Sequence, residues 1–511
     1  MKNTKKLLMS LALIMAAGTA SGCSRQVEIK VLHANPVSVA DLRAKYSSSN
    51  PIEITFWSNF GASMTSYVET ALDAFQDKYD FIKVTHEGKG GYEGLLNAMV
   101  KSLNSSSYPN VAVGYPDHFA TYISSSIQYE LDTFIESEEY GVDLSDYRAD
   151  YLRENQSLFY KDGANKTQPW TVGLPYNKST EVMVYNKSLF TALGLEAPKT
   201  WAEVETVGAA IIAEFDGHFG SPYTIEYEDA EGQPQSYTID LTGVTKEEFY
   251  PLSWDAQANF FITMAYQFGG EYTEMGDTLE SGYIKFNNPE VLSALAYIQD
   301  LGRTKHILGI PSTWNETSYC SAPFKANKSV MTISSSAGVT NNIPSGNKFE
   351  VGISSIPYKD EEHKYVISQG ANLGIFKSDD DHATASWLLI RYLTGGEYTT
   401  DENANVDFCI SSGYLPVTIS GESSDWYQQY IHSVGTPADQ AKISVQKIAN
   451  ETYVNENWHK FVDPAFIGSA TIRQEVEKIT QFILTGASGK IYTPQEAIDF
   501  VYKRLSRYVE K

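Results

Sequence analysis

The chain has little cysteine and none of the short motifs that mark common hydrolases and nucleotide-binding enzymes. Its 511 residues include three cysteines, and no pair stands at zinc-site spacing. It holds no Gly-x-Ser-x-Gly, His-Glu-x-x-His or P-loop motif, and its 9 histidines are scattered. We therefore expect no catalytic residues, no cofactor and no metal, and a protein that is not an enzyme.

Positive charge is also scarce. The chain has 39 Lys and Arg against 63 Asp and Glu, a formal net charge of -24. Such a protein is poorly suited to nucleic acid or to anionic membrane surfaces, so we expect no nucleic-acid partner. A hydrophobic fraction of 42%, with 13% aromatic residues, is ample for sizeable cores, and the length predicts more than one domain.

The apolar run at the start of the chain is too short to span a bilayer. It covers Leu7 to Ala17, follows several lysines and precedes the small residues Ala20-Ser21-Gly22 and Cys23. This pattern predicts a lipoprotein signal peptide over residues 1–22, export, and lipidation of Cys23, which would anchor the protein to the membrane, facing the periplasm or cell exterior. An ordinary secretory signal cleaved near Cys23 is the alternative.

The two other cysteines, Cys320 and Cys409, show no spacing pattern, so two buried thiols are favoured over a disulfide. Residues 23–51 are polar and rich in serine towards their end, and they predict a tether between the anchor and the fold.

From residue 52 onwards, strand-like and helix-like segments alternate, which predicts an α/β fold with mainly parallel sheets. The expected strands are Ile52–Trp57, Ile82–Thr85, Asn110–Gly114, Val182–Tyr185 and Val330–Ile333, and the expected helices include Tyr92–Leu103. The polar stretch Tyr223–Glu247 predicts a hairpin or loop. Ligands of such folds bind beyond the carboxyl ends of strands, so the loops at Trp57 and at Tyr115 to Asp117 are candidate binding loops.

The segment from Gly173 to Trp201, GLPYNKSTEVMVYNKSLFTALGLEAPKTW, is the most specific part of the sequence. Locally it predicts a strand, a helix capped by Ser188 and ended by Gly194, and a second helix opened by a capping box of Thr200 and Glu203. Its full spelling resembles the signature of the family 1 extracellular solute-binding proteins, the sugar-type receptors of bacterial ABC importers. The segments Gln369–Phe376, Gly413–Pro416 and Thr493–Phe500 extend the resemblance to the C-terminus.

The resemblance implies a two-lobe periplasmic-binding-protein fold, with discontinuous lobes, a hinge and a ligand cleft between them. The implied N-terminal lobe is 52–180 plus 370–420, and the implied C-terminal lobe is 181–369 plus 421–511. The hinge is expected near Glu181 and Ser368. The implied activity is capture of a sugar, polyol or phosphorylated polyol by a monomer that delivers it to ABC permease subunits.

Within the family, the chain is most similar to the glycerol-3-phosphate-binding proteins. Carrying their ligand contacts over implies ligand-binding roles for Tyr92, Ser179, Ser335, Ser336, Gly370, Tyr414 and Arg473. Their acidic contact is displaced, because Pro116 stands at that position and Asp117 follows it.

Phosphate and sugar remain open alternatives. Arg473 with the serine loop suits a phosphate. Flat aromatic faces suit sugar rings, and Trp57, Tyr115, Trp254, Trp314 and Tyr414 stand in candidate loops. Two other functions remain open: a lipid-anchored surface glycoside hydrolase, whose two carboxylates need no motif, and a surface binding or adhesion lipoprotein that keeps the fold without transport.

Overall fold

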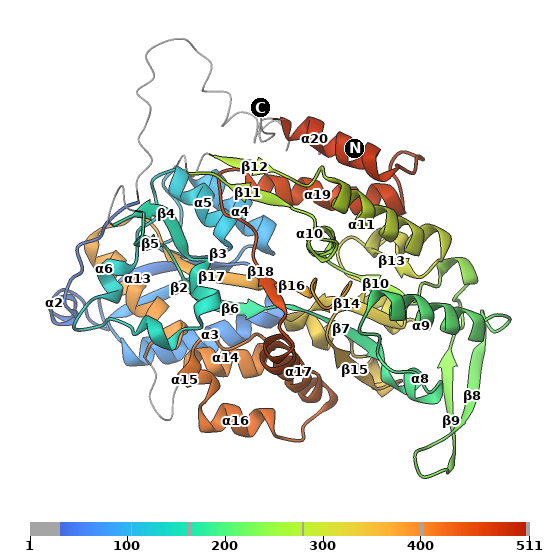
Figure 1. The fold of residues 1–511 in the computed structure, drawn as a ribbon. Coiled ribbons are helices and arrows are strands. Elements are labelled where there is room, and N and C mark those ends of the chain that lie inside the picture. The colour runs from blue at the N-terminus through green and yellow to red at the C-terminus, as the bar shows by residue number, and fades with distance from the viewer. Residues whose placement is uncertain (1–30, 104, 162–165, 278–280, 398–402, 507–511) are drawn as a thin grey trace.

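Figure 1 shows two lobes side by side, each built around its own sheet. The computed structural model describes residues 31–103, 105–161, 166–277, 281–397 and 403–506. One five-stranded sheet has the order β2-β1-β3-β17-β6 and the other has the order β13-β10-β14-β7-β15. Each sheet lies in a separate apolar core. The predicted two-lobe α/β fold is confirmed.

The N-terminal lobe follows the predicted alternation of strand and helix. Its sheet comprises β1 (Ile52–Ser58), β2 (Ile82–Gly88), β3 (Val111–Gly114), β6 (Leu174–Ser179) and β17 (Gln369–Ile375). Its helices include α3 (Ala62–Lys78), α4 (Tyr92–Ser102), α5 (Pro116–Ser124), α13 (Asp380–Leu393) and α14 (Ala404–Ser412). The central strands bury apolar side chains against these helices, so the core of the lobe is continuous.

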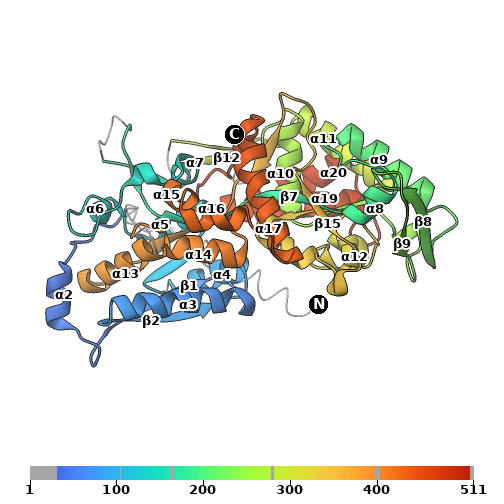
Figure 2. The same ribbon diagram turned by 90° about the horizontal axis from the view of Figure 1, so that it is seen from below.

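The C-terminal lobe has the same plan. Its sheet comprises β7 (Glu181–Asn186), β10 (Leu252–Trp254), β13 (Leu308–Gly309), β14 (Met331–Ser335) and β15 (Val351–Ser354). Its helices include α9 (Trp201–Glu214), α10 (Gln257–Gln267), α11 (Pro289–Gln299), α19 (Ser469–Leu484) and α20 (Pro494–Arg504). Helix α17 (Pro437–Lys447) packs on β15, and Figure 2 shows it crossing between the lobes.

The sheets are mainly parallel, as predicted, with one reversed strand in each. In the N-terminal sheet β1 pairs in parallel with β2 and β3, but β17 is antiparallel to both β3 and β6. The second sheet repeats this, because β7 is antiparallel to β14 and β15. Parallel neighbours in a sheet are joined by a crossover helix, whereas β6 passes directly into β7 and β16 (Tyr365–Ile367) passes directly into β17. The reversed strands, β7 and β17, are therefore the ones that follow these crossings.

The first two passages of the chain between the lobes lie close together; a later passage follows between α14 and α17. The first crossing is at Thr180, between β6 and β7, and the second is at Ser368, between β16 and β17. The Thr180 hydroxyl donates to the Ile367 carbonyl at 2.7 Å, which ties one crossing to the other. These are the positions at which the sequence predicts the hinge.

The local prediction for the signature segment is correct except for one cap. The capping box of Thr200 and Glu203 opens α9 as expected. Helix α8 (Lys187–Ala192), however, is capped by Asn186, whose side chain accepts from the Leu189 N–H. Ser188 instead accepts the N–H of Glu350, because the helix begins two residues earlier than expected. The stretch after α9 forms an antiparallel hairpin, β8 (Pro222–Glu228) and β9 (Pro234–Asp240), as predicted.

Residues 31–51 differ from the tether predicted over 23–51, because they pack on the N-terminal lobe. They include helix α2 (Val39–Lys45), which buries Leu42 completely. The Val37 N–H donates to the Thr384 hydroxyl at 3.0 Å. A polar, serine-rich composition gave no sign of these few anchoring contacts.

Several predictions concern the cysteines and the membrane. Cys320 and Cys409 are buried free thiols, as favoured. Cys23 and the signal peptide lie outside the described residues. Among the helices that the structure describes, none is both long and apolar enough to cross a bilayer.

Gly370 provides a test of the crossing geometry. Its φ is +106°, and a Cβ there would lie 2.0 Å from the Asn177 carbonyl oxygen of the adjacent β6. We expect Gly370→Ala to destabilise the protein by about 2 kcal/mol or more, since both the backbone conformation and the contact oppose a side chain. Thermal unfolding measures this. Gly338→Ala is the control, because its nearest contact would be 3.7 Å away. Equal melting temperatures for the two variants would contradict the geometry.

Candidate ligand-binding cleft

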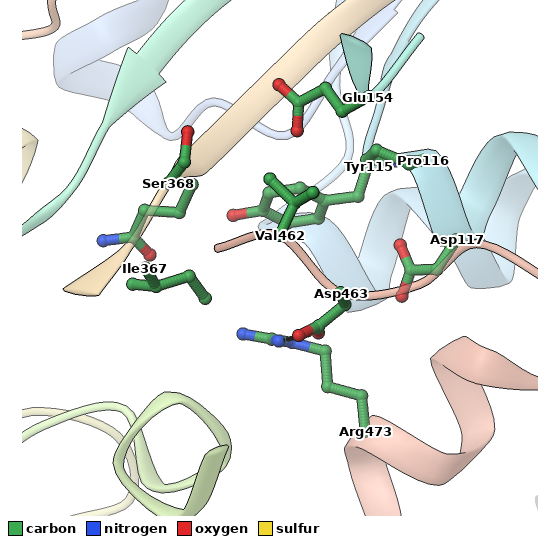
Figure 3. A pocket seen from close by; sticks show the side chains of 10 residues that line it. Tyr115, Pro116, Asp117, Glu154, Ile367, Ser368, Val462, Asp463 and Arg473 are labelled. Carbon is green, nitrogen blue, oxygen red and sulfur yellow. Dashed lines mark hydrogen bonds and ion pairs between the residues drawn. The ribbon is translucent and has the colours of Figure 1, made fainter. Parts of the chain in front are cut away.

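A pocket lies between the lobes, beside the second chain crossing. It is lined by Tyr115, Pro116, Asp117, Glu154, Ile367, Ser368, Gln369, Val462, Asp463 and Arg473. Figure 3 shows side chains entering it from β3–α5, from the crossing and from α19. Its free volume is about 30 Å³, room for one or two water molecules. A ligand pocket is typically about ten times larger, so the pocket as it stands is too small for a sugar-sized ligand.

Arg473 is the cationic centre of the pocket. It projects from α19, and Figure 3 shows its guanidinium beside Asp463. Its Nη1 donates to the Asp463 carboxylate and its Nη2 to the Asn259 side-chain oxygen. Burial opposes the charge, but Asp463 and Asp117 outweigh it and hold the pKa of Arg473 above its ordinary value. The guanidinium is therefore permanently charged and already ion-paired.

Asp117 brings a second carboxylate to the pocket from the other lobe. It stands at the start of α5, its side chain is 5% exposed, and Oδ1 accepts the His118 N–H at 2.9 Å. Burial lowers the pKa of His118, so this imidazole is neutral near pH 7 and does not balance the carboxylate. Helices α5 and α19 are in contact across the lobes. Asp117 and Arg473 thus face each other across the interface.

A buried ion pair forms another wall. Glu154 lines the pocket and pairs with Lys178 of β6, and both side chains are almost fully buried. The Lys178 ammonium also donates to the Gly370 carbonyl at 3.3 Å. This pair balances its own charges, so the carboxylates of Asp117 and Asp463 and the guanidinium of Arg473 leave the pocket with a net charge of about -1.

Three tyrosines form an aromatic cluster next to these charges. The rings of Tyr92 and Tyr115 lie 4.2 Å apart, and Asn177 donates to the Tyr92 hydroxyl at 3.1 Å. Tyr414 stacks on Phe408 and lies next to Tyr92. Burial raises the pKa of each of the three phenols, so they stay neutral hydrogen-bonding groups. The cluster offers apolar ring surface and hydroxyls from a single lobe.

Behind Arg473, a carboxyl group lies buried at the first crossing. Glu181 is 0% exposed, and its Oε1 accepts from Trp254 Nε1 and from Asn259 Nδ2, each at 3.1 Å. Burial raises the pKa of Glu181 to about 7, although these hydrogen bonds and Arg473 oppose the shift. The charge of Glu181 therefore changes near neutral pH.

Several buried polar atoms around the pocket have no protein partner among the described residues. They are Asn177 Oδ1, His118 Nδ1, Ser368 Oγ, Asp463 Oδ1 and Glu181 Oε2. Buried polar groups in native proteins are nearly always hydrogen-bonded, to protein or to ordered water or ligand. Of these, Ser368 Oγ and Asp463 Oδ1 belong to residues that line the pocket, where a bound molecule can complete their hydrogen bonds.

The structure brings most of the predicted site residues together, in three groups. Tyr115, Asp117 and Arg473 line the pocket, and Tyr92 and Tyr414 adjoin it. Ser179, Ser335, Ser336 and Gly370 lie at the ends of strands next to the crossings. Of these, Ser336 accepts the Thr180 N–H at 3.1 Å, so its hydroxyl is engaged in holding the first crossing.

Two predicted residues are placed away from the pocket. Trp254 is 0% exposed and stacks between Trp201 and Phe260 in the C-terminal core, because β10 is a fully buried inner strand of its sheet. Trp57 lies on the outer side of β1 with the Lys89 ammonium 3.7 Å above its ring. A third aromatic candidate, Trp314, donates its indole N–H to the Glu248 carbonyl and is likewise absent from the pocket lining.

Four pocket or pocket-supporting residues were missed: Glu154, Gln369, Asp463 and Asn259. Asn259 carries a sequence signal, since it is a polar residue in the mainly apolar stretch Ala258–Tyr266. Asp463 likewise follows the apolar Phe461 and Val462, whereas Glu154 stands among polar residues, where nothing separates it from surface residues.

The comparison with protein families agrees with this geometry. Residues 70–435 match the family described as bacterial extracellular solute-binding protein. The chain belongs to this family. Its members bind solutes outside the cytoplasm, which agrees with the predicted fold and function.

Individual relatives of this family resemble nearly the whole chain. The sn-glycerol-3-phosphate-binding periplasmic protein UgpB of Escherichia coli (strain K12) is 23% identical over 468 residues, covering 90% of this chain and 92% of the relative. UgpB from Mycobacterium tuberculosis in complex with glycerophosphocholine superposes with a TM-score of 0.65 at 18% identity, covering 90% and 98%. Maltose-bound MalE3 of T. maritima has a TM-score of 0.62 at 16% identity, covering 90% and 100%. These relatives are binding proteins rather than enzymes.

Glu181 gives a pH-dependent test of the site. Its pKa rises from 4.5 in an exposed setting to about 7 in the fold. The folded state thus holds a proton that the unfolded chain has lost between these values, so stability falls as the pH rises from about 4.5 to 7. Glu181→Gln removes this loss and should be more stable than wild type at pH 8, by up to about 3 kcal/mol, with the difference vanishing near pH 4.5.

Melting temperatures of both proteins between pH 4.5 and 8 measure the effect. The exposed Glu362→Gln variant controls for the loss of one surface charge. A difference between Glu181→Gln and wild type that is constant with pH would contradict the assignment.

Proposed function

We propose that this protein is the receptor of an ABC importer and captures a polyhydroxylated ligand that carries no net negative charge. Sugars, polyols and zwitterionic glycerophosphodiesters meet this description. The observation that carries the proposal is the charge of the pocket, in which Arg473 is already paired with Asp463 and faces Asp117.

The electrostatic argument separates the alternatives that the sequence left open. A phosphate monoester with a charge of about -1.5 to -2 would compete with Asp463 for Arg473 and would approach Asp117, so repulsion would offset much of the attraction. The hydroxyls of a neutral ligand can donate to both carboxylates and accept from the guanidinium. The tyrosines of the adjoining cluster supply apolar surface for a sugar ring or a cation–π partner for a quaternary ammonium group.

Ligand entry requires the lobes to separate. The pocket of about 30 Å³ is lined by residues of both lobes, and it is too small for a sugar-sized molecule unless the lobes move apart. We propose that these crossings act as the hinge and that closure around the ligand forms the surface presented to the permease. The protein then acts by binding alone, as its relatives do.

Attachment to the membrane completes the proposal. The start of the sequence supports lipidation at Cys23, which would hold the receptor near its permease. In the test, wild type should take up an acyl label and stay with the membranes, whereas Cys23→Ser should take up no label and appear in the soluble fraction.

A ligand panel tests the charge argument. Isothermal titration of the mature protein with maltotriose, glycerophosphocholine, glycerol and sn-glycerol-3-phosphate should show binding of at least one uncharged or zwitterionic compound. It should show at least about tenfold weaker binding of sn-glycerol-3-phosphate, a difference of roughly 1.4 kcal/mol. Tighter binding of sn-glycerol-3-phosphate than of the other three would overturn the proposal.

Asp117→Asn tests the same argument from the protein side. Removing this carboxylate should increase the affinity for sn-glycerol-3-phosphate by about tenfold, because repulsion of the anion is relieved. Asp132→Asn is the control, since Asp132 is also a buried aspartate of the N-terminal lobe but accepts from the Thr171 N–H, away from the pocket. An equal change in both variants would remove Asp117 from the argument.

A further inference from the structure

A single buried amide connects Arg473 to both chain crossings. Asn259 lies on α10 and is 2% exposed, within a run of apolar residues. It does not line the pocket, so ligand contact does not account for it. A polar side chain at a core position is costly unless all its hydrogen bonds are made, which directs attention to its partners.

The partners of Asn259 fix the direction of its side chain. Oδ1 accepts from Arg473 Nη2, and Nδ2 donates to Glu181 Oε1 and to Gln369 Oε1, each at 3.1 Å. The reversed amide would set Nδ2 against a guanidinium donor and Oδ1 against two acceptors. All three contacts would then be repulsive, so only one orientation is stable.

The same contacts lead to the first two places where the chain changes lobes. Glu181 is the first residue of β7, directly after the crossing at Thr180. Gln369 is the first residue of β17, directly after the crossing at Ser368, and its Nε2 donates to the Thr180 carbonyl at 3.0 Å. The Asn259 side chain therefore contacts Glu181 and Gln369, the first residues of the two strands that follow these crossings. Because Gln369 also bonds to Thr180, it links the two crossings to each other.

We propose that Asn259 is a positioning residue for the ligand site. It holds the Arg473 guanidinium in one orientation, with Nη2 turned towards α10, Nη1 towards Asp463, and the remaining N–H groups left for the pocket. Because its other partners stand at the crossings, the orientation of Arg473 is tied to the arrangement of the two lobes. This proposal rests on the proposed function at one point, namely that Arg473 contacts the ligand.

The charges around the amide favour the same arrangement. Arg473 faces Asp463 and Asp117, and Glu181 faces Asp255 and Arg473. Asn259 hydrogen-bonds to both Arg473 and Glu181. An uncharged amide between a guanidinium and a carboxyl lets each keep a partner without forming a direct ion pair. Arg473 thereby remains available to the cleft.

The first test needs no ligand. Nitrogen-15 NMR of arginine-labelled protein reports hindered rotation of a guanidinium as separate Nη signals, and the Arg473→Lys variant identifies those of Arg473. We expect separate signals in wild type and an averaged signal in Asn259→Ala, with rotation at least about tenfold faster, because Nη2 loses its acceptor. Asn259→Leu, of similar volume, serves if the alanine variant does not fold.

A matched control lies on the same helix. Gln267 is also a buried amide of α10 that makes several hydrogen bonds, to Trp201, Pro357 and Tyr365, and none to Arg473. Gln267→Ala should destabilise the fold but leave the Arg473 signals unchanged. Separate Arg473 signals in Asn259→Ala, or equal loss in both variants, would overturn the proposal.

The conservative variant Asn259→Asp separates the two halves of the contact. It keeps an acceptor for Arg473 but sets a second carboxylate oxygen against Glu181 and Gln369, so the link to the crossings is lost. We expect its Arg473 signals to stay separate. An averaged signal here would show that the acceptor alone does not hold the guanidinium, which would also overturn the proposal.

The second test measures binding of maltotriose and glycerophosphocholine by calorimetry. For whichever probe wild type binds, we expect about tenfold weaker binding by Asn259→Ala and less than twofold by Gln267→Ala. Unchanged affinity in Asn259→Ala would contradict a positioning role in binding. If wild type binds neither probe, the proposed ligand class fails, whereas the NMR comparison still decides whether Asn259 orients Arg473.

Discussion

The structure of the cleft depends on the burial of one guanidinium between two lobes. A buried charge is very costly unless it is paired and hydrogen-bonded, so the surroundings of Arg473 are constrained on every side. Asp463 and Asn259 satisfy it from its own lobe, and Asp117 adds negative charge from the other. The pairing explains why the pocket is tight and why its net charge does not favour an anion. Removing any one of these groups would leave a buried charge with too few partners.

The topology places this charge cluster beside the two crossings. In each sheet, parallel strands lie next to one reversed strand that begins at a crossing. The reversed strands are β17 and β7, and each runs antiparallel to its neighbours. Because β6 passes into β7 through Thr180 alone, the side chains next to Thr180 touch both lobes. Polar residues at this position can therefore respond to lobe movement, which residues in either core cannot do. The site and the crossings are one unit in structural terms.

Much of the fold could be predicted from the sequence, because its signals are local. The strand at Ile52, the hairpin after α9 and the capping box at Thr200 each follow from periodicity or turn chemistry over a few residues. The direction of β17 could not be predicted this way. It depends on how the chain returns from the other lobe, and no residue within β17 records that path.

The pocket could be predicted only where a family resemblance supplied it. Arg473 and Tyr115 were predicted from matching segments or loop position, and both line the pocket. Asp463 was missed, since its role arises from a contact with α19 that is made only in the folded chain. Trp254 was misplaced for the opposite reason. A tryptophan at the end of a strand is equally suited to a cleft or a core, and here the indole N–H found its acceptor in Glu181 inside the core.

The interactions across the cleft also limit what a ligand has to do. Asp117 and Arg473 attract each other when the lobes are closed, so part of the free energy of closure comes from the protein itself. A ligand shifts the balance between open and closed forms only through the difference in its affinity for the two. A molecule that bound Arg473 in one lobe alone would bind both forms equally and leave the balance unchanged. A ligand with several hydroxyls can contact Asp117 on one side and Asp463 on the other, and it gains these contacts together only when the lobes meet. Under the proposed function, selectivity for such ligands therefore follows from the placement of one carboxylate on each lobe.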